Sequence, residues 1–138
     1  MLPGILAASL LTVLSAIHCY WACGGQWGRS SVIPEVEGKP QFHPGKGATV
    51  LVALLLAVAA LTIVGQLGLW GTALPAGLFF WGTRFIAGAF FLRVIGDFRL
   101  VGLFKRVRTT RFAYWDSHVY VPLCLTIAVL TFFAAGRN

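Results

Sequence analysis

The sequence predicts an all-α integral membrane protein, a single domain over residues 1–138 that folds as a four-helix bundle. Of its residues, 58% are hydrophobic and only 11% are charged, whereas a soluble domain is about half apolar and about a quarter charged. The apolar residues also fall in four long blocks, each close to the roughly 17–25 residues that cross a hydrocarbon core. So few polar groups cannot cover a globule in water, and the composition therefore indicates lipid as the solvent.

The first apolar block predicts a transmembrane helix at about residues 2–22. Pro3 suits the first turn of a helix, and Gly24 and Gly25 follow its end. No Lys or Arg precedes the apolar run, as a signal peptide would require, so we expect this helix to be retained in the protein.

The other three blocks predict helices at about residues 48–66, 75–96 and 118–135. The second helix is almost pure Ala, Val and Leu, and a short uncharged link joins it to the third. The third helix opens at Pro75 and carries two arginines. The fourth has Pro122 in its first turn, where proline is tolerated.

The basic residues predict the orientation of the bundle. Most of them belong to the two long loops, at residues 24–47 and 97–117, whereas the opposite side has only Arg137. The positive-inside rule therefore places both loops in the cytoplasm and both termini on the non-cytoplasmic side. Because the net charge of +7 gathers in these loops rather than on a folded basic face, we expect no nucleic-acid partner. The basic residues of the first loop are Arg29, Lys39 and Lys46.

The segment between the third and fourth helices predicts contact with lipid head groups. From Phe98 to Val107, basic and apolar residues alternate with helical spacing. This pattern is typical of an interfacial helix on an anionic cytoplasmic leaflet. The residues expected at that interface are Arg99, Lys105, Arg106, Arg108 and Arg111.

Arg84 is the most informative single residue. It lies about nine residues into the third helix, which at roughly 1.5 Å per residue places it near mid-membrane. A charge at that depth costs at least about 2.5 kcal/mol and normally faces the bundle interior or a wet cavity. Helical spacing places Gly77, Trp81 and Gly88 on the same stripe. Small residues there let another helix approach, and Trp81 lies within cation–π reach of the guanidinium.

Two interpretations of Arg84 follow. It contacts an anion, a quinone or a substrate inside the bundle, or it bonds to helix-end carbonyls or to a loop carboxylate such as Glu35 or Glu37. The first loop would then fold as a cap that brings these glutamates towards Arg93 or Arg84. Arg93 is close enough to the cytoplasmic end to snorkel, and Asp97, four residues on, is expected to pair with it as a structural anchor.

His18 and His118 are expected at the same cytoplasmic depth on different helices. They are candidate axial ligands for haem b or members of a proton relay. The alternative is a pair of imidazoles that bond at the membrane interface. The three cysteines form no CxxC pair, so we predict no disulfide. No metal site is predicted, and no bound cofactor other than the haem b alternative.

Several short stretches together resemble a family of small bacterial membrane proteins, catalogued as domain of unknown function 3995. The resemblance covers essentially the whole chain. It implies a four-helix bacterial membrane protein and brings no established activity. The stretches that carry it are His18–Trp21 with Gly24 and Gly25, Val32–Pro34, Leu92–Arg99, Gly102–Phe104 with Phe112 and Asp116, and Tyr120–Cys124.

The sequence favours a membrane protein without a catalytic site. It contains no P-loop, zinc signature, nucleophile elbow or dinucleotide fingerprint. We therefore expect an accessory or small-ligand- or lipid-binding subunit of the bacterial cytoplasmic (inner) membrane, packed against itself or other membrane subunits. The alternatives are a haem-binding or other redox protein using His18 and His118, and an oligomeric transporter or proton-coupled carrier using Arg84.

Overall fold

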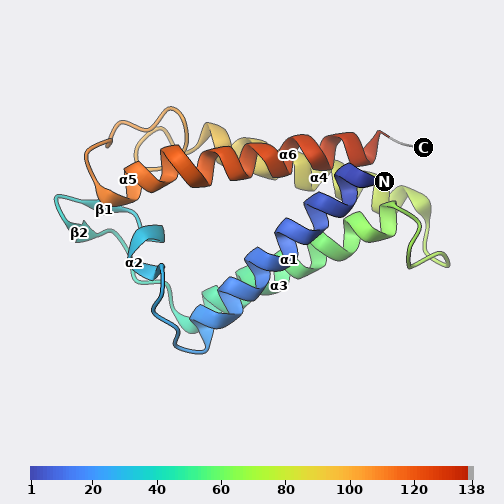
Figure 1. Cartoon of the computed structure of the whole chain (residues 1–138), viewed down its shortest axis with the longest axis horizontal. Helices are drawn as coiled ribbons and strands as arrows, with labels where there is room; N and C mark the ends of the chain where they lie inside the picture. The colour runs from blue at the N-terminus through green and yellow to red at the C-terminus, as the bar shows by residue number, and fades with distance from the viewer. Residues whose placement is uncertain (137–138) are drawn as a thin grey trace.

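A computed structural model of the protein describes residues 1–136, and four long antiparallel helices account for most of them (Figure 1). Each is long and apolar enough to cross a membrane, which confirms the predicted all-α membrane bundle. The helices are α1 (Leu2–Ala22), α3 (Lys46–Gln66), α4 (Ala76–Ile95) and a last helix made of α5 (Arg111–Trp115), the π-helical turn η1 (Asp116–Tyr120) and α6 (Val121–Ala135).

The last helix begins at residue 111 rather than at the expected 118. Thr110 caps it, because its hydroxyl accepts a hydrogen bond from the backbone N–H of Ala113 at 3.1 Å. The π-helical turn ends at Tyr120, two residues before Pro122. Proline has no N–H and its ring clashes with the carbonyl four residues earlier, so a helix that continues through Pro122 must rearrange there.

The four helices form two pairs, with α1 packed on α3 and α4 packed on α6. Figure 1 shows that the pairs meet at the end where α1 begins and α6 ends, and diverge towards the other end. Small side chains dominate the core between them, so the helix backbones approach closely. The core residues are Ala7, Ala8, Leu11, Ala59, Ala60, Ile63, Ile127 and Ala134.

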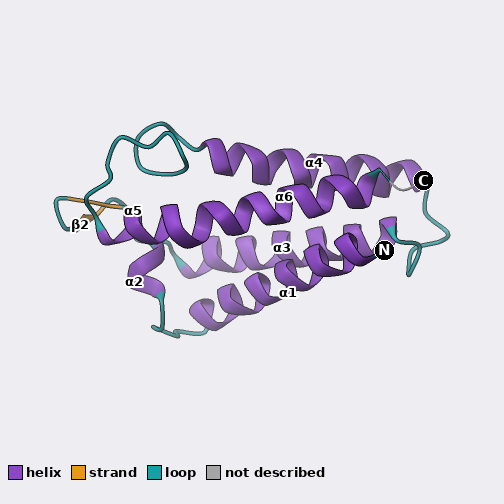
Figure 2. Cartoon of the chain, turned by 45° about the horizontal axis from the view of Figure 1, so that its top comes forward, coloured by secondary structure: helices purple, strands orange, loops and turns teal. Residues whose placement is uncertain are grey.

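The loop between α1 and α3 is folded at the diverging end. It contains the short helix α2 (Arg29–Val32) and a hairpin of β1 (Glu35–Val36) and β2 (Lys39–Pro40), the only strands in the described residues (Figure 2). The hydroxyl of Tyr120 donates to the carbonyl of Ser31 at 3.1 Å. The loop thereby connects the α1–α3 pair to the last helix.

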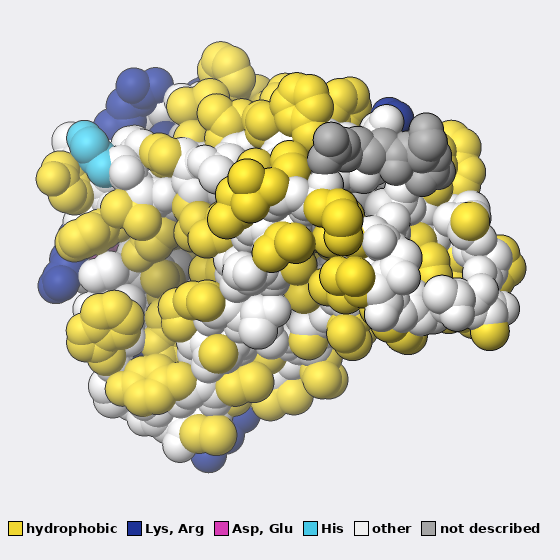
Figure 3. Space-filling model, turned by 45° about the vertical axis from the view of Figure 1, so that its right-hand side comes forward, with side chains coloured by type: hydrophobic (Ala, Val, Ile, Leu, Met, Phe, Trp, Pro, Cys, Tyr) yellow, Lys and Arg dark blue, Asp and Glu magenta, His cyan; other side chains and the backbone are white. Residues whose placement is uncertain are grey.

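The outer surface of the bundle is strongly apolar. Hydrophobic side chains cover much of the face shown in Figure 3. In water such a surface would aggregate, whereas lipid tails solvate it. The exposed large side chains of α3 and α4 include Leu51, Leu54, Leu55, Val58, Leu61, Leu78, Trp81, Phe85 and Leu92.

Candidate functional site

Arg84 lies in the middle of α4 and points towards α6. Its guanidinium carbon is 4.9 Å from the ring centre of Phe80 and 5.3 Å from that of Phe132 on α6. The expected contact with Trp81 is wrong. Trp81 is 69% exposed on the outer face of α4 and meets the edge of Phe80 instead, with ring centres 5.3 Å apart.

No other part of the described chain neutralises Arg84. Its Nε atom is buried without a hydrogen-bond partner among residues 1–136. The expected bonds to helix-end carbonyls or to a loop glutamate are therefore wrong. Glu35 instead accepts the backbone N–H of Arg111 at 3.0 Å, and Glu37 lies exposed in the hairpin turn, because the hairpin packs beside α5 and not inside the bundle.

Two threonines, one beside Arg84 and one beside Phe132, also have buried polar atoms without a hydrogen-bond partner in the described residues. Thr83 precedes Arg84 on α4, and Thr131 precedes Phe132 on α6. Both side chains are fully buried, and both hydroxyls lack a hydrogen-bond partner within the described residues. A buried unpaired polar group typically costs about 1–3 kcal/mol. Of the four buried side-chain atoms that lack a hydrogen-bond partner in residues 1–136, three therefore lie on Thr83, Arg84 and Thr131, and the fourth is Nη1 of Arg93 near the end of α4. Neither threonine was predicted from the sequence as a site residue, because a single threonine in a membrane helix normally bonds to its own backbone.

A second polar cluster lies at the diverging end and is centred on Asp116, whose side chain is fully buried. One carboxylate oxygen accepts from Nη2 of Arg93 at 2.7 Å. The other accepts from the backbone N–H of Gly102 at 2.9 Å and from Nζ of Lys105 at 3.0 Å. Nζ of Lys105 also donates to Oγ of Ser117 at 2.7 Å. The cluster joins α4, the following loop and the last helix.

This cluster corrects two expectations. Arg93 pairs with Asp116 and not with Asp97, because α4 ends at Ile95 and Asp97 lies beyond the helical register that would bring it near Arg93. Lys105 does not face lipid, because its side chain is only 3% exposed and is held by Asp116. Sequence analysis assigned no role to Asp116, since no spacing rule connects it to Arg93, 23 positions away.

Residues 96–110, here called the rim loop, form no helix, so the expected interfacial helix from Phe98 to Val107 is wrong. Gly96, Phe98 and Gly102 have φ values of 86°, 62° and 90°, which interrupt any right-handed helix. Backbone bonds fold the loop back on α4, and the N–H of Leu103 donates to the carbonyl of Val94 at 2.8 Å.

Asp97 organises the first turn of the rim loop. One carboxylate oxygen accepts the backbone N–H groups of Arg99, Leu100 and Val101 at 2.9, 2.7 and 2.9 Å. Burial acts to raise the pKa of Asp97, but these N–H donors outweigh it and hold the pKa below its ordinary value. The folded state therefore binds the proton less readily than the unfolded chain does.

Asp97 should make stability depend on pH in the acid range. Because its folded-state pKa is lowered, its stabilising contribution is complete above the unfolded pKa of about 3.9 and is lost as the pH falls through the folded-state pKa. We expect Asp97→Asn to flatten the fall in unfolding free energy below about pH 4. Denaturant titrations in detergent at several pH values measure this slope. An unchanged slope in the variant would contradict the assignment.

The two candidate haem ligands lie on different helix pairs. His18 is in the last turns of α1 and His118 in η1, at the end where the pairs diverge (Figure 1). Nδ1 of His18 is 2.7 Å from the carbonyl of Leu14, and Nδ1 of His118 is 2.8 Å from that of Tyr114. Each imidazole is thus oriented by its own helix. Within residues 1–136, no group of three or more His, Cys, Asp or Glu side chains is close enough to hold a metal ion.

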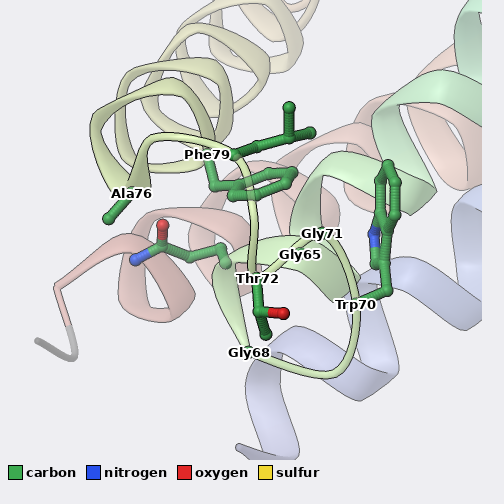
Figure 4. Close-up of a pocket in the computed structure, with 9 residues that line it drawn as sticks. Gly65, Gly68, Trp70, Gly71, Thr72, Ala76 and Phe79 are labelled. Atoms are coloured by element: carbon green, nitrogen blue, oxygen red, sulfur yellow. The ribbon is translucent and has the colours of Figure 1, made fainter.

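A hollow of about 240 Å³ lies at the α3–α4 link, at the opposite end from the Asp116 cluster. Figure 4 shows the rings of Trp70 and Phe79 beside the backbone of Gly65 and Gly71. The two rings meet edge to face at 5.6 Å, and the indole N–H of Trp70 donates to the carbonyl of Leu61 at 2.6 Å. None of the sequence-predicted site residues lines this hollow.

The fold and the polar groups of residues 1–136 together define a small four-span membrane protein, in which the buried Nε of Arg84 has no hydrogen-bond partner among the described residues. The family model described as "Protein of unknown function (DUF3995)" matches residues 11–131, and the chain belongs to this family. No curated protein and no solved structure matches the chain.

Proposed function

We propose that the protein is a non-catalytic accessory subunit of a membrane assembly, in which Arg84 pairs with an anionic group that another molecule supplies. The observation that carries the proposal is the guanidinium of Arg84. It lies inside a membrane-spanning helix, and its buried Nε has no partner in the described part of the chain. Charged side chains at that depth normally pair with an opposite charge or with backbone carbonyls.

The aromatic contacts of Arg84 do not replace a counter-ion. A cation–π contact contributes about 0.5–2 kcal/mol. Insertion of an arginine at the centre of a helix costs at least about 2.5 kcal/mol, and more on an isolated helix. Phe80 and Phe132 together contribute about 1–4 kcal/mol, which is comparable with the lower cost and well below the roughly 10–17 kcal/mol found for an isolated helix. A carboxylate from outside would therefore still be stabilising.

A second copy of the chain cannot supply that carboxylate at mid-membrane. The chain has four acidic residues. Glu35 and Glu37 belong to the hairpin, Asp97 follows the end of α4, and Asp116 is already paired at the same end of the bundle. We therefore propose a different membrane protein as partner, with an Asp or Glu inside one of its helices.

We further propose that both termini lie outside the cytoplasm and that the protein belongs to the cytoplasmic membrane of a bacterium. Eight of the 11 Lys and Arg residues lie in residues 29–46 and 99–111, at the diverging end. The positive-inside rule assigns that end to the cytoplasm. Fusion of a reporter that fluoresces only in the cytoplasm to each loop and terminus tests this orientation.

Arg84→Met and Arg84→Lys separate a binding role from a structural one. We expect wild-type protein and Arg84→Lys to co-purify with the partner after gentle solubilisation, and Arg84→Met to lose it at least about tenfold, because one side of a buried ion pair is removed. Quantitative mass spectrometry of the purified complexes measures this ratio. The isolated Arg84→Met subunit should be as stable as wild type or more so, since an unneutralised charge is gone.

Two outcomes would contradict the proposal. A marked loss of stability in isolated Arg84→Met would make Arg84 a structural residue of this chain. Recovery of a lone monomer from the wild-type membrane under every gentle condition would leave Arg84 without a protein partner. In that case lipid analysis of the purified protein would show whether an anionic amphiphile occupies the site.

A further inference from the structure

The rim loop exposes apolar and basic side chains together. Phe98, Leu103 and Phe104 are 57%, 52% and 59% exposed, and the rings of Phe98 and Phe104 lie 6.2 Å apart. Arg99 and Arg106 are also exposed. These five side chains are here called the rim surface. Exposed phenylalanines beside arginines are unusual in a loop that faces only water, and they are typical of a membrane interface.

The folding of the loop places the rim surface beside the ends of the membrane helices. The N–H of Leu103 bonds to the carbonyl of Val94, which is inside the last turn of α4. The N–H of Gly102 bonds to Asp116, five residues past the start of the last helix. Both anchors hold the loop against the ends of the membrane-spanning helices.

The charge of this region is strongly positive. Residues 93–116 contain six basic side chains and two acidic ones, so their net charge is +4 (six minus two), more than half of the +7 of the whole chain. Both acidic groups already have partners: Asp116 pairs with Arg93 and Lys105, and Asp97 accepts backbone N–H groups. No hydrogen bond involves the guanidinium of Arg99 or Arg106 anywhere in residues 1–136.

We propose that the rim surface binds anionic phospholipids of the adjoining leaflet. Phe98, Leu103 and Phe104 enter the boundary between head groups and acyl chains, and Arg99 and Arg106 contact the lipid phosphates. A flexible chain would pay conformational entropy to gather these groups, whereas the Asp116 cluster holds them in place beforehand. This inference is independent of the proposed role of Arg84, which lies deeper and on the α4–α6 contact.

The test compares lipid selectivity between two charge-matched double variants of the full chain. Arg99→Gln/Arg106→Gln removes the two basic groups of the rim surface. Lys39→Gln/Lys46→Gln removes the same charge from two other exposed positions at the same end of the bundle, in β2 and at the first residue of α3. Spin-labelled phosphatidylglycerol and phosphatidylcholine, each at the same level in vesicles with the reconstituted protein, report the fraction of lipid immobilised by the protein.

We expect wild-type protein and the Lys39/Lys46 variant to prefer phosphatidylglycerol, and the Arg99/Arg106 variant to lose at least about fivefold of that preference. Helix content and thermal unfolding in pure phosphatidylcholine should be equal in all three proteins. An undiminished preference in the Arg99/Arg106 variant overturns the proposal and assigns the rim surface to a protein partner. An equal loss in both variants overturns it as well, because total charge and not this surface would then attract the lipid.

Discussion

Asp116→Ala is expected to lower the free energy of unfolding by about 3–5 kcal/mol, the cost of removing one partner of a buried ion pair. The substitution leaves Lys105, 3% exposed, without its carboxylate, and it frees Arg93 and the N–H of Gly102. Three segments are released at once: the end of α4, the rim loop and the start of the last helix. Reversible unfolding in mixed micelles with increasing denaturing detergent measures the loss.

Asp97→Ala is the matched control, since it removes the other carboxylate of the same region from an exposed position. We expect it to cost only about 1 kcal/mol, as the loss of a capping side chain does. Adding Lys105→Met to Asp116→Ala should recover part of the stability, because the uncompensated buried ammonium is then gone. Equal effects of Asp116→Ala and Asp97→Ala would show that the Asp116 cluster does not hold the rim loop.

Gly102→Ala is expected to cost about 3 kcal/mol or more, from backbone strain and overpacking together. The φ angle of Gly102 is +90°, which an L-residue rarely adopts. An added Cβ would also lie 2.5 Å from Cα of Gly96 and from the carbonyl oxygen of Ile95. These backbone atoms cannot move without opening the turn that follows α4. Thermal unfolding of the purified variant in detergent tests this.

Gly88→Ala provides a control of opposite sign. Gly88 lies on the outer face of α4, and an added Cβ there meets no atom within 4 Å. Replacing a helical glycine by alanine at such a site is expected to stabilise the isolated protein by about 0.5–1 kcal/mol. If Gly102→Ala were as harmless as Gly88→Ala, the close contact between Gly96 and Gly102 would not exist in the folded protein.

The four membrane helices could be predicted from the sequence, because the bilayer imposes a local rule. A backbone without water must satisfy its own hydrogen bonds, and an apolar stretch of sufficient length does so as a helix. The start of the last helix was harder to predict from the sequence. Tyr114, Asp116 and His118 are polar enough to suggest a loop, yet Thr110 caps the helix before them and Phe112 and Ala113 bury its first turn.

The pairing of charges could not be predicted in the same way. The spacing of Arg93 and Asp97 suits a helical pair only while the helix continues, and α4 stops at Ile95. The helical spacing from Phe98 to Val107 is likewise overruled, because Gly96 and Gly102 cross in close contact and Asp116 draws Lys105 inward. These contacts join residues 6 and 11 positions apart across a loop, and helical periodicity does not predict them.

The amino-acid sequence is sufficient to predict that this protein crosses a membrane four times and that Arg84 lies deep within the third crossing. Both follow from the lengths of the apolar blocks and from the rise of a helix. Which charges are neutralised depends instead on the three-dimensional fold: Arg93 and Lys105 share Asp116, whereas Nε of Arg84 has no partner in residues 1–136. Neutralisation requires two side chains to meet in space, and in this bundle that depends on how the loops fold against the helix ends.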